Sequence, residues 1–399
     1  MTTDGFETGF DIVIAGAGPA GLCLAAALEN RRLRIAVVDR QPLAALADPA
    51  FDGREIALTH ASVAALHRLD VWSRIPADEI AGIRDVRVFN GLSDRFMHVD
   101  HTDGGASELG SLVSNHLIRR AAYEAARQRD HVTMIDDASV CEAHWQPDAV
   151  KVRLSNQAVL RAPLLVAADG RFSEVRRKAA IAVRSRDFGK TMLVCRMEHE
   201  RPHGQIASEW FHYGQTLALL PLSGNRSSVV ITVTGSEGRR LQQLDVVDFN
   251  AEVERRYRGR MGWMRRTSEV FAYPLVAVIA DRFAGPRCAL IGDAAVGMHP
   301  VTAHGFNLGL AGAVRLAREI DRAAADGRDI GASRVLTAYE RAHVRAALPL
   351  YLGSNALVNL YTSDRLPARL VRGALIRLGD EVRPFKKALA ISLTRARAH

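Results

Sequence analysis

One glycine-rich segment near the N-terminus restricts the fold of this chain more than any other feature. The apolar run Asp11–Ala15 leads directly into Gly16-Ala-Gly18-Pro-Ala-Gly21, which is followed by an Ala- and Leu-rich stretch. A second apolar run ends in Asp39, 18 residues after Gly21. This order predicts a strand, a tight turn, a helix and a second strand. Such a βαβ unit belongs to a parallel sheet whose strands are buried on both faces.

The spacing of these glycines has a physical reason. Gly16 allows the tight turn, Gly18 lets the backbone approach a pyrophosphate, and Gly21 lets helix and strand pack closely. The free N–H groups of the helix N-terminus favour phosphate. Asp39 is placed to accept hydrogen bonds from an adenosine ribose. The unit predicts dinucleotide binding without choosing between NAD and FAD; a coincidental glycine turn is the alternative.

Two further apolar runs also end in an acid. The run 164–168 ends at Asp169-Gly170, and the run 288–291 ends at Gly292-Asp293. In an α/β sheet these positions lie at the carboxyl edge, where ligands bind. A purely structural alternative exists for each acid, because Asp169 can close a turn and Asp293 can cap a helix. After Pro300, the turn Gly305-Phe306-Asn307 opens an amphipathic helix.

Taken together, the three motifs resemble the group A FAD-dependent aromatic hydroxylases, the family of para-hydroxybenzoate hydroxylase. Within it, the chain most resembles the ubiquinone-biosynthesis hydroxylases, over nearly its whole length. The resemblance implies FAD as the dinucleotide, O₂ as co-substrate and NAD(P)H or another electron donor. It also implies transfer of one oxygen from a flavin hydroperoxide to an aromatic ring. The cofactor-binding residues that it implies are Gly16, Gly18, Gly21, Asp39, Arg40, Arg54, Asn115, Asp169, Asp293, Gly305, Phe306 and Asn307.

The stretch around the ring-binding turn departs from the family pattern. The family usually has G-Q-G where this chain has Ala303-His304-Gly305, and Gly312 stands where an acid is common. We expect His299, Pro300 and His304 to lie beside the flavin or the substrate and to act in catalysis. The alternative is that both histidines are ordinary core or surface residues.

The middle of the chain has a different pattern. Short alternating runs between residues 185 and 280, with a turn at Ser223-Gly-Asn-Arg226, predict an antiparallel sheet with a helix over 246–258 on its back. The predicted fold class is α/β: a Rossmann-like FAD-binding domain, an inserted, mainly antiparallel substrate domain and a C-terminal helical segment. The expected FAD-binding parts are 1–82, 106–182 and 281–345. The expected substrate-domain parts are 83–105 and 183–280, and the C-terminal basic segment is 346–399.

Composition excludes several other classes. The four cysteines are far apart and no H-E-x-x-H pattern occurs, so we expect neither a disulfide framework nor a metal site. The longest apolar run, Val270–Ala280, contains Pro274 and is shorter than the ~20 residues that a membrane span needs. The first ten residues lack the apolar stretch of a signal peptide, so we expect a cytoplasmic protein.

The C-terminal residues carry much of the net charge of +9. Residues 364–399 contain nine Lys/Arg and three Asp/Glu, and leucines fall on one side of a predicted helix. A basic amphipathic helix can lie on the inner membrane face, where a polyprenylated quinol would be found. Packing of this helix on the FAD-binding domain is the alternative. Nucleic-acid binding is not expected, because no motif accompanies the charge.

The sequence therefore predicts an FAD-dependent monooxygenase for an aromatic ring, most simply a lipidic quinol precursor of ubiquinone, with other biosynthetic enzymes as partners. Three alternatives stay open at this point. The first is a hydroxylase of a soluble phenol or polyketide, and the second is a flavin reductase of isoprenoid double bonds. The third is a non-catalytic FAD-binding scaffold of a biosynthetic complex.

Overall fold

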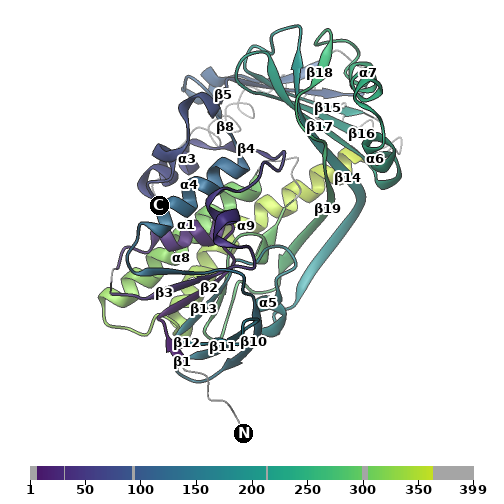
Figure 1. Ribbon diagram of the computed structural model, residues 1–399. Helices are drawn as coiled ribbons and strands as arrows, with labels where there is room; N and C mark the ends of the chain where they lie inside the picture. Colours follow the sequence, from purple (N-terminus) through teal and green to yellow (C-terminus); the bar gives the residue numbers. More distant parts are fainter. Residues whose placement is uncertain (1–6, 31, 92–94, 213, 299–303, 363–399) are drawn as a thin grey trace.

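The computed structural model describes residues 7–30, 32–91, 95–212, 214–298 and 304–362 (Figure 1). Its centre is a six-stranded sheet in the order β20-β21-β13-β2-β3-β9. Every neighbouring pair is parallel except β20 and β21. The strands are β2 (Ile12–Ala15), β3 (Ile35–Val38), β9 (Val132–Ile135), β13 (Leu164–Ala167), β20 (Ala284–Gly285) and β21 (Cys288–Leu290).

The predicted βαβ unit is confirmed. Helix α1 (Pro19–Ala27) connects β2 and β3, and all residues of both strands are buried. Gly16 has φ +107°, and a Cβ there would lie 2.4 Å from the Ala168 carbonyl oxygen. A Cβ on Gly21 would lie 2.0 Å from the Gly16 carbonyl oxygen. Both glycines are therefore required by the packing of the chain on itself.

Different layers cover the two faces of this sheet. On one face, α1 packs against α4 (Asn115–Arg127) and α8 (His304–Ala325). On the other face lies a small sheet in the order β1-β12-β11-β10, visible below the central strands in Figure 1. The sequence analysis did not predict this small sheet. Its strands are β1 (Glu7–Gly9), β10 (Val140–Trp145), β11 (Val150–Leu154) and β12 (Val159–Ala162).

A second large sheet stands at the other end of the molecule (Figure 1), in the order β22-β19-β14-β17-β16-β15-β6-β7. We call it the roof sheet. The strands predicted in this region are confirmed, although β15 pairs with β6 in parallel. The strands are β6 (Asp85–Asn90), β7 (Phe96–Val99), β14 (Val183–His199), β15 (Ile206–His212), β16 (Gln215–Pro221), β17 (Arg226–Thr234), β18 (Met264–Arg266), β19 (Phe271–Ala280) and β22 (Val296–Gly297).

The outer face of the roof sheet is covered by α6 (Gly235–Gln242) and α7 (Val246–Arg256), close to the predicted helix. Trp210 of the sheet, Phe249 of α7 and Tyr257 belong to one buried cluster there. The Tyr257 hydroxyl donates a hydrogen bond to the Ala218 carbonyl oxygen over 2.7 Å. The helix pair thus occupies one face of the sheet and leaves the opposite face toward the FAD-binding half.

Strands β14 and β19 of the roof sheet extend as a long ribbon toward the central sheet (Figure 1). The sequence analysis expected only short alternating runs in this region, whereas β14 has 17 residues. Its pairing with β19 shifts register between Asp187 and Thr191, and Gly189 has φ +61° at this shift. The irregularity hides the strand in the sequence, because the residue alternation changes phase there.

A small sheet, β4 (Glu55–Leu58), β8 (Gly110–Ser114) and β5 (Ala81–Ile83), lies between the two halves. The shorter helices are α2 (Leu43–Ala47), α3 (His60–Arg68) and α5 (Glu174–Lys178). The long helix α9 (Ser333–Thr362) contains Pro349 and packs on α8. Residues 363–399 lie outside the described part, and the domain limits expected above stay predictions. No helix among the described residues is long and apolar enough to span a bilayer.

Candidate FAD-binding and active site

Four candidate residues of the central sheet meet at one edge. Gly16 follows β2, Asp39 follows β3, Asp169 comes just after β13, and Asp293 just after β21. These strands are neighbours, in the order β21-β13-β2-β3. The structure therefore brings together residues that are far apart in the sequence, at the edge where open α/β sheets bind ligands.

The first glycine turn has the shape of a phosphate cradle. A Cβ added to Gly18 would meet no atom within 4 Å, so the packing of the chain does not explain this glycine. Helix α1 begins directly after it, and no side chain caps its N-terminal N–H groups. An open approach to uncapped N–H groups fits a pyrophosphate, and the residues present therefore fit FAD.

Asp39 is fixed against this cradle. One carboxylate oxygen accepts from the Ala17 N–H over 2.7 Å, and the other accepts from the Gln41 N–H over 2.9 Å. Arg119 donates to the Gln41 side chain over 2.8 Å. Arg40, also expected to bind the cofactor, is exposed beside Asp39. The carboxylate is thus held beside the turn, at the end of β3.

The acids after β13 and β21 have different surroundings. Asp169 accepts hydrogen bonds from the Ser173 hydroxyl and the Val175 N–H, so it supports the first turn of α5, whose N-cap is Ser173. Burial raises the pKa of its carboxyl group. Asp293 accepts from Arg171 over 3.0 Å, and 38% of its side chain is exposed. Asp169 thus makes the contacts expected if its role is to close a turn. Part of the Asp293 side chain stays accessible.

A second group of polar residues surrounds Arg54. Its guanidinium pairs with Asp52 over 2.6 Å and lies over the Tyr273 ring at 5.5 Å. Asn115 donates to Asp52 over 2.8 Å. Burial disfavours charge on Arg54, but the hydrogen bond and the charge of Asp52 together raise its pKa; Asp293 adds to this. Arg54, Asn115 and Asp293 therefore belong to one electrostatic neighbourhood.

The residues at the start of α8 form the remaining part of the site. Asn307 donates to the Ala57 carbonyl oxygen over 2.8 Å and accepts from the Thr59 N–H over 3.1 Å. Its side chain therefore ties α8 to β4. Phe306 packs against the main core, and a Cβ on Gly305 would meet nothing within 4 Å. His304 begins α8, whereas His299 and Pro300 lie outside the described residues.

Sequence reasoning missed several residues that organise this site. Asp52 and Tyr273 hold Arg54, and the Tyr273 hydroxyl donates to the Asp52 carbonyl oxygen over 2.6 Å. Arg176 is buried and donates to the Ala294 carbonyl oxygen over 2.8 Å, linking the two acidic motifs. Asp52 stands two residues before the expected Arg54, and Arg176 follows soon after Asp169-Gly170, so a charged residue near a candidate residue was an available signal. Tyr273 carried no such signal.

A buried histidine occupies the space next to Gly312. His343 of α9 is fully buried, and a Cβ on Gly312 would lie 2.7 Å from its Nε2. Arg315 contacts Nδ1 of His343 over 3.1 Å. Burial, with a smaller contribution from Arg315, lowers the pKa of His343 to about 3. The position where the family often has an acid is thus used here for close packing of α8 against α9.

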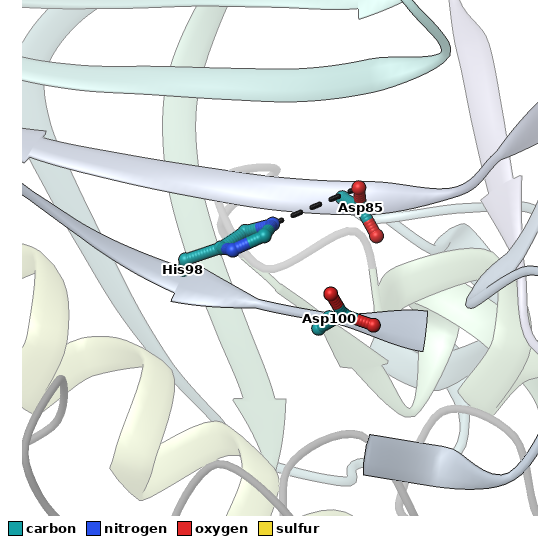
Figure 2. A group of neighbouring side chains, drawn as sticks. All are labelled: Asp85, His98 and Asp100. Carbon is teal, nitrogen blue, oxygen red and sulfur yellow. Dashed lines mark ion pairs between the residues drawn. The ribbon is translucent and has the colours of Figure 1, made fainter. Parts of the chain in front are cut away.

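A separate cluster of titratable groups joins β6 to β7 in the roof sheet. Figure 2 shows Asp85, His98 and Asp100, with His98 3.6 Å from the Asp85 carboxylate. Asp85 also accepts from His101 over 2.8 Å and from Arg84 over 3.2 Å. Asp100 accepts from the Thr102 N–H over 2.7 Å. The carboxylates are engaged by the protein itself, so the cluster has a sufficient structural explanation.

Comparisons with known proteins agree with this geometry. The sequence pattern of the FAD binding domain family matches residues 9–348. The ubiquinone hydroxylase UbiM of Neisseria meningitidis is 46% identical over 96% of this chain and 84% of its own length. The ubiquinone hydroxylase UbiL of Rhodospirillum rubrum is 35% identical over 94% of this chain and 88% of its own length.

Solved structures share the fold. The p-nitrophenol 4-monooxygenase PnpA of Pseudomonas putida superposes with a TM-score of 0.78 at 18% identity, covering 97% of this chain and 98% of that one. PqsL of Pseudomonas aeruginosa superposes with a TM-score of 0.77 at 22% identity, covering 92% of this chain and all of that one. The fold and the site thus define an FAD-dependent monooxygenase. The chain belongs to the FAD binding domain family of aromatic hydroxylases, alongside the ubiquinone hydroxylases.

Proposed function

We propose that this enzyme hydroxylates the aromatic ring of a polyprenylated quinol precursor in ubiquinone biosynthesis. The single observation that carries the proposal is the 46% identity to UbiM over 96% of the chain. The similarity to UbiL, at 35% identity, supports the same reaction class. The solved structures named above are less than 25% identical to this chain, so they support the fold and leave the substrate open.

The roles of individual residues are part of the proposal. Gly16, Gly18 and Gly21 form the turn for the FAD pyrophosphate, and Asp39, with Arg40 beside it, receives the adenosine ribose. Asp293 binds the ribityl chain, and Arg54 and Asn115 lie along the flavin. When bound, FAD supplies the oxygen-activating redox chemistry, with electrons from NAD(P)H or another donor.

The ring end of the cofactor would lie near the start of α8. In this proposal Gly305, Phe306 and Asn307 border the flavin ring, and His299, Pro300 and His304 act in catalysis near the flavin or the substrate. Asp169 contributes indirectly by fixing the turn after β13. The roof sheet covers the site and excludes water, which protects reactive intermediates from hydrolysis.

We further propose that the substrate is lipidic and that the enzyme meets it at a membrane surface. Exposed leucines on α9 support this: Leu348, Leu350 and Leu352 have 41%, 37% and 57% of their surface accessible. Flotation with vesicles of anionic phospholipid tests the idea, with neutral vesicles and a Leu348→Ser/Leu352→Ser variant as controls. Equal recovery of both proteins in the vesicle fraction would count against this role of α9.

The proposed reaction is tested by complementation. The chain is expressed in a bacterial strain that lacks the ring hydroxylases of ubiquinone synthesis, and quinone intermediates are identified by mass spectrometry. We expect the accumulated precursor to decrease and a product heavier by one oxygen atom to appear. An Asp293→Ala variant, which we expect to bind FAD more weakly, serves as the matched control. Unchanged intermediates with a well-expressed, yellow protein would contradict the assignment.

A further inference from the structure

Strand β15 presents its residues alternately to the two faces of the roof sheet. Trp210 belongs to the cluster beneath α6 and α7. Ala207, on the opposite face, packs with Ala81 of β5 and Leu112 of β8. Because side chains alternate along a strand, Glu209 shares the face of Ala207, which is turned toward the FAD-binding half. A carboxyl group therefore lies on the inner face of the roof.

The inner face around Glu209 is otherwise apolar. The register of the sheet places one residue from each strand in a continuous row across this face. In the order of the strands, the row consists of Met97, Val88, Glu209, Ala218, Val230, Val194 and Phe271. Glu209 is the one titratable residue of this row, so no charged residue stands directly opposite it on either adjacent strand.

Glu209 is partly buried and forms no hydrogen bond or ion pair with the described residues. Burial raises the pKa of its carboxyl group to about 8. Two more polar atoms without a hydrogen bond among the described residues are Oδ1 of Asn90 and Oγ of Ser228. Their neighbours in the chain, Phe89 and Val229, belong to the outer cluster. Because side chains alternate along a strand, Asn90 and Ser228 therefore lie on the inner face. Buried polar atoms normally find partners, so these two atoms point to a polar ligand on the inner face, where the partly buried Glu209 also lies.

The same row connects Glu209 to the cofactor end of the site. Phe271, at the end of the row, fills the space beside Gly53, where a Cβ would lie 2.5 Å from its ring. Gly53 precedes Arg54. At ~4.8 Å per strand, the four strand spacings between Glu209 and Phe271 correspond to about 19 Å along the sheet. The residues of the row between them are apolar, as contact with an aromatic ring and a long apolar substituent requires.

We propose that Glu209 is a catalytic residue of this enzyme, which hydrogen-bonds the hydroxyl group of the aromatic substrate and accepts its proton. The inference rests on the proposed ring hydroxylation. In this step the O–H bond of the substrate breaks and an O–H bond forms on the carboxylate of Glu209. The electron pair stays on the ring oxygen, so the ring becomes more electron-rich without any change in oxidation state.

The pKa values of a phenolic hydroxyl and of the Glu209 carboxyl group favour this role. A phenolic hydroxyl has a pKa of about 10. An ordinary Glu carboxylate, with a pKa of about 4.3, is too weak a base to accept its proton. A base works best when its pKa lies near the operating pH. The apolar row around Glu209 raises the pKa of its carboxyl group toward this range through desolvation. The same surroundings would make Glu209 unfavourable for folding, as expected of a residue kept for function.

Binding of para-cresol to the oxidised FAD-loaded enzyme tests the proposal, read from the change in flavin absorbance. Hydrogen bonds to a charged acceptor are roughly twice as strong as neutral ones. We therefore expect the affinity of the unchanged enzyme to rise about tenfold as Glu209 ionises around pH 8. E209Q should bind para-cresol without this pH dependence. E198Q, an exposed glutamate of the same sheet paired with Arg265, should behave as the unchanged enzyme.

A second variant separates function from folding. E209M completes the apolar row, so we expect an equal or higher Tm, full FAD loading and loss of the pH dependence of binding. Ring hydroxylation by E209Q and E209M, measured at equal FAD loading, should fall at least 100-fold in kcat with a smaller change in KM.

Two results have distinct meanings. If E209Q keeps the pH dependence or the hydroxylation rate of the unchanged enzyme, the role of Glu209 is overturned while ring hydroxylation stands. If para-cresol binding depends on Glu209 but the unchanged enzyme hydroxylates no quinol precursor, the contact stands and the proposed reaction fails.

Discussion

Arg171 donates a hydrogen bond to Asp293 over 3.0 Å and joins two motifs that lie 122 residues apart in the chain. A second hydrogen bond from Arg171, to the Val276 carbonyl oxygen over 2.6 Å, fixes the guanidinium to β19. The ion pair thus links the acid after β21 to both the turn after β13 and the ribbon that carries the roof sheet.

The first prediction concerns Asp293. Asp293→Asn keeps the size of the side chain and removes its charge. A hydrogen bond to a charged group contributes about 1.5–3 kcal/mol, so we expect FAD affinity to fall by about ten- to 100-fold. Fluorescence titration of the apoprotein with FAD measures the effect. Asp281→Asn, in an exposed pair with Arg184, is the control and should bind FAD normally.

The second prediction contrasts two glycines of one turn. Gly18→Ala should fold with an unchanged Tm as apoprotein, because its Cβ would meet no atom within 4 Å, but should lose FAD affinity. Gly21→Ala should lower the Tm itself, because its Cβ would lie 2.0 Å from the Gly16 carbonyl oxygen. Scanning calorimetry and FAD titration distinguish the two. Normal FAD affinity of Gly18→Ala would contradict the proposed pyrophosphate cradle.

The third prediction concerns pH and His343. Its pKa in the folded protein is lowered to about 3, against about 6.5 in an unfolded chain. Between these values only the unfolded chain binds the proton, so stability is lost as the pH falls from about 6.5 toward 3. At pH 5 the loss from this group is about 2 kcal/mol.

Urea denaturation at neutral pH and at pH 5 measures that difference. His343→Asn retains an acceptor for Arg315 and cannot titrate, so its stability should change less with pH. The control is His144→Asn, because 69% of the His144 side chain is exposed. If His343→Asn shows the same acid loss as the unchanged protein, another group is responsible.

The fourth prediction concerns Asp85 in the roof sheet. Burial opposes its ionisation, but hydrogen bonds from His101 and Arg84 hold its pKa below the usual value. Asp85→Asn should therefore lower the free energy of unfolding by about 1.5–3 kcal/mol while FAD affinity is unchanged. Asp148→Asn, with a side chain that is 70% exposed, should have little effect. A loss of FAD binding by Asp85→Asn would indicate coupling between the two halves.

Much of the central fold could be predicted from the sequence. Strands β2, β3, β13 and β21 are buried on both faces, so their apolar runs are continuous and easily recognised. The small sheet β10–β12 was missed because its strands are short and partly exposed; β11, which alternates as Val150-Lys-Val-Arg-Leu154, could have been recognised. The full length of β14 was missed because its register shift at Asp187–Thr191 changes the alternation.

The candidate site was predictable where the backbone conformation requires a residue type. Gly16 needs a positive φ, and Gly21 allows close packing, so both leave a pattern in the sequence. Asp52 and Tyr273 are different, because their contacts with Arg54 join loops from distant parts of the chain. Glu209 was equally hidden, since its unusual pKa arises from strands that pair with β15 only in the folded molecule.

The ribbon of β14 and β19 connects the roof sheet to the cofactor edge of the central sheet. Its register shift near Gly189 is a local bend in otherwise regular pairing, so a displacement of the roof would concentrate its backbone change there. Arg171 holds the same ribbon at Val276, immediately beside the shift. Loss of the Arg171–Asp293 pair would therefore affect two places at once, the acid at the cofactor edge and the guanidinium that contacts the ribbon beside its register shift.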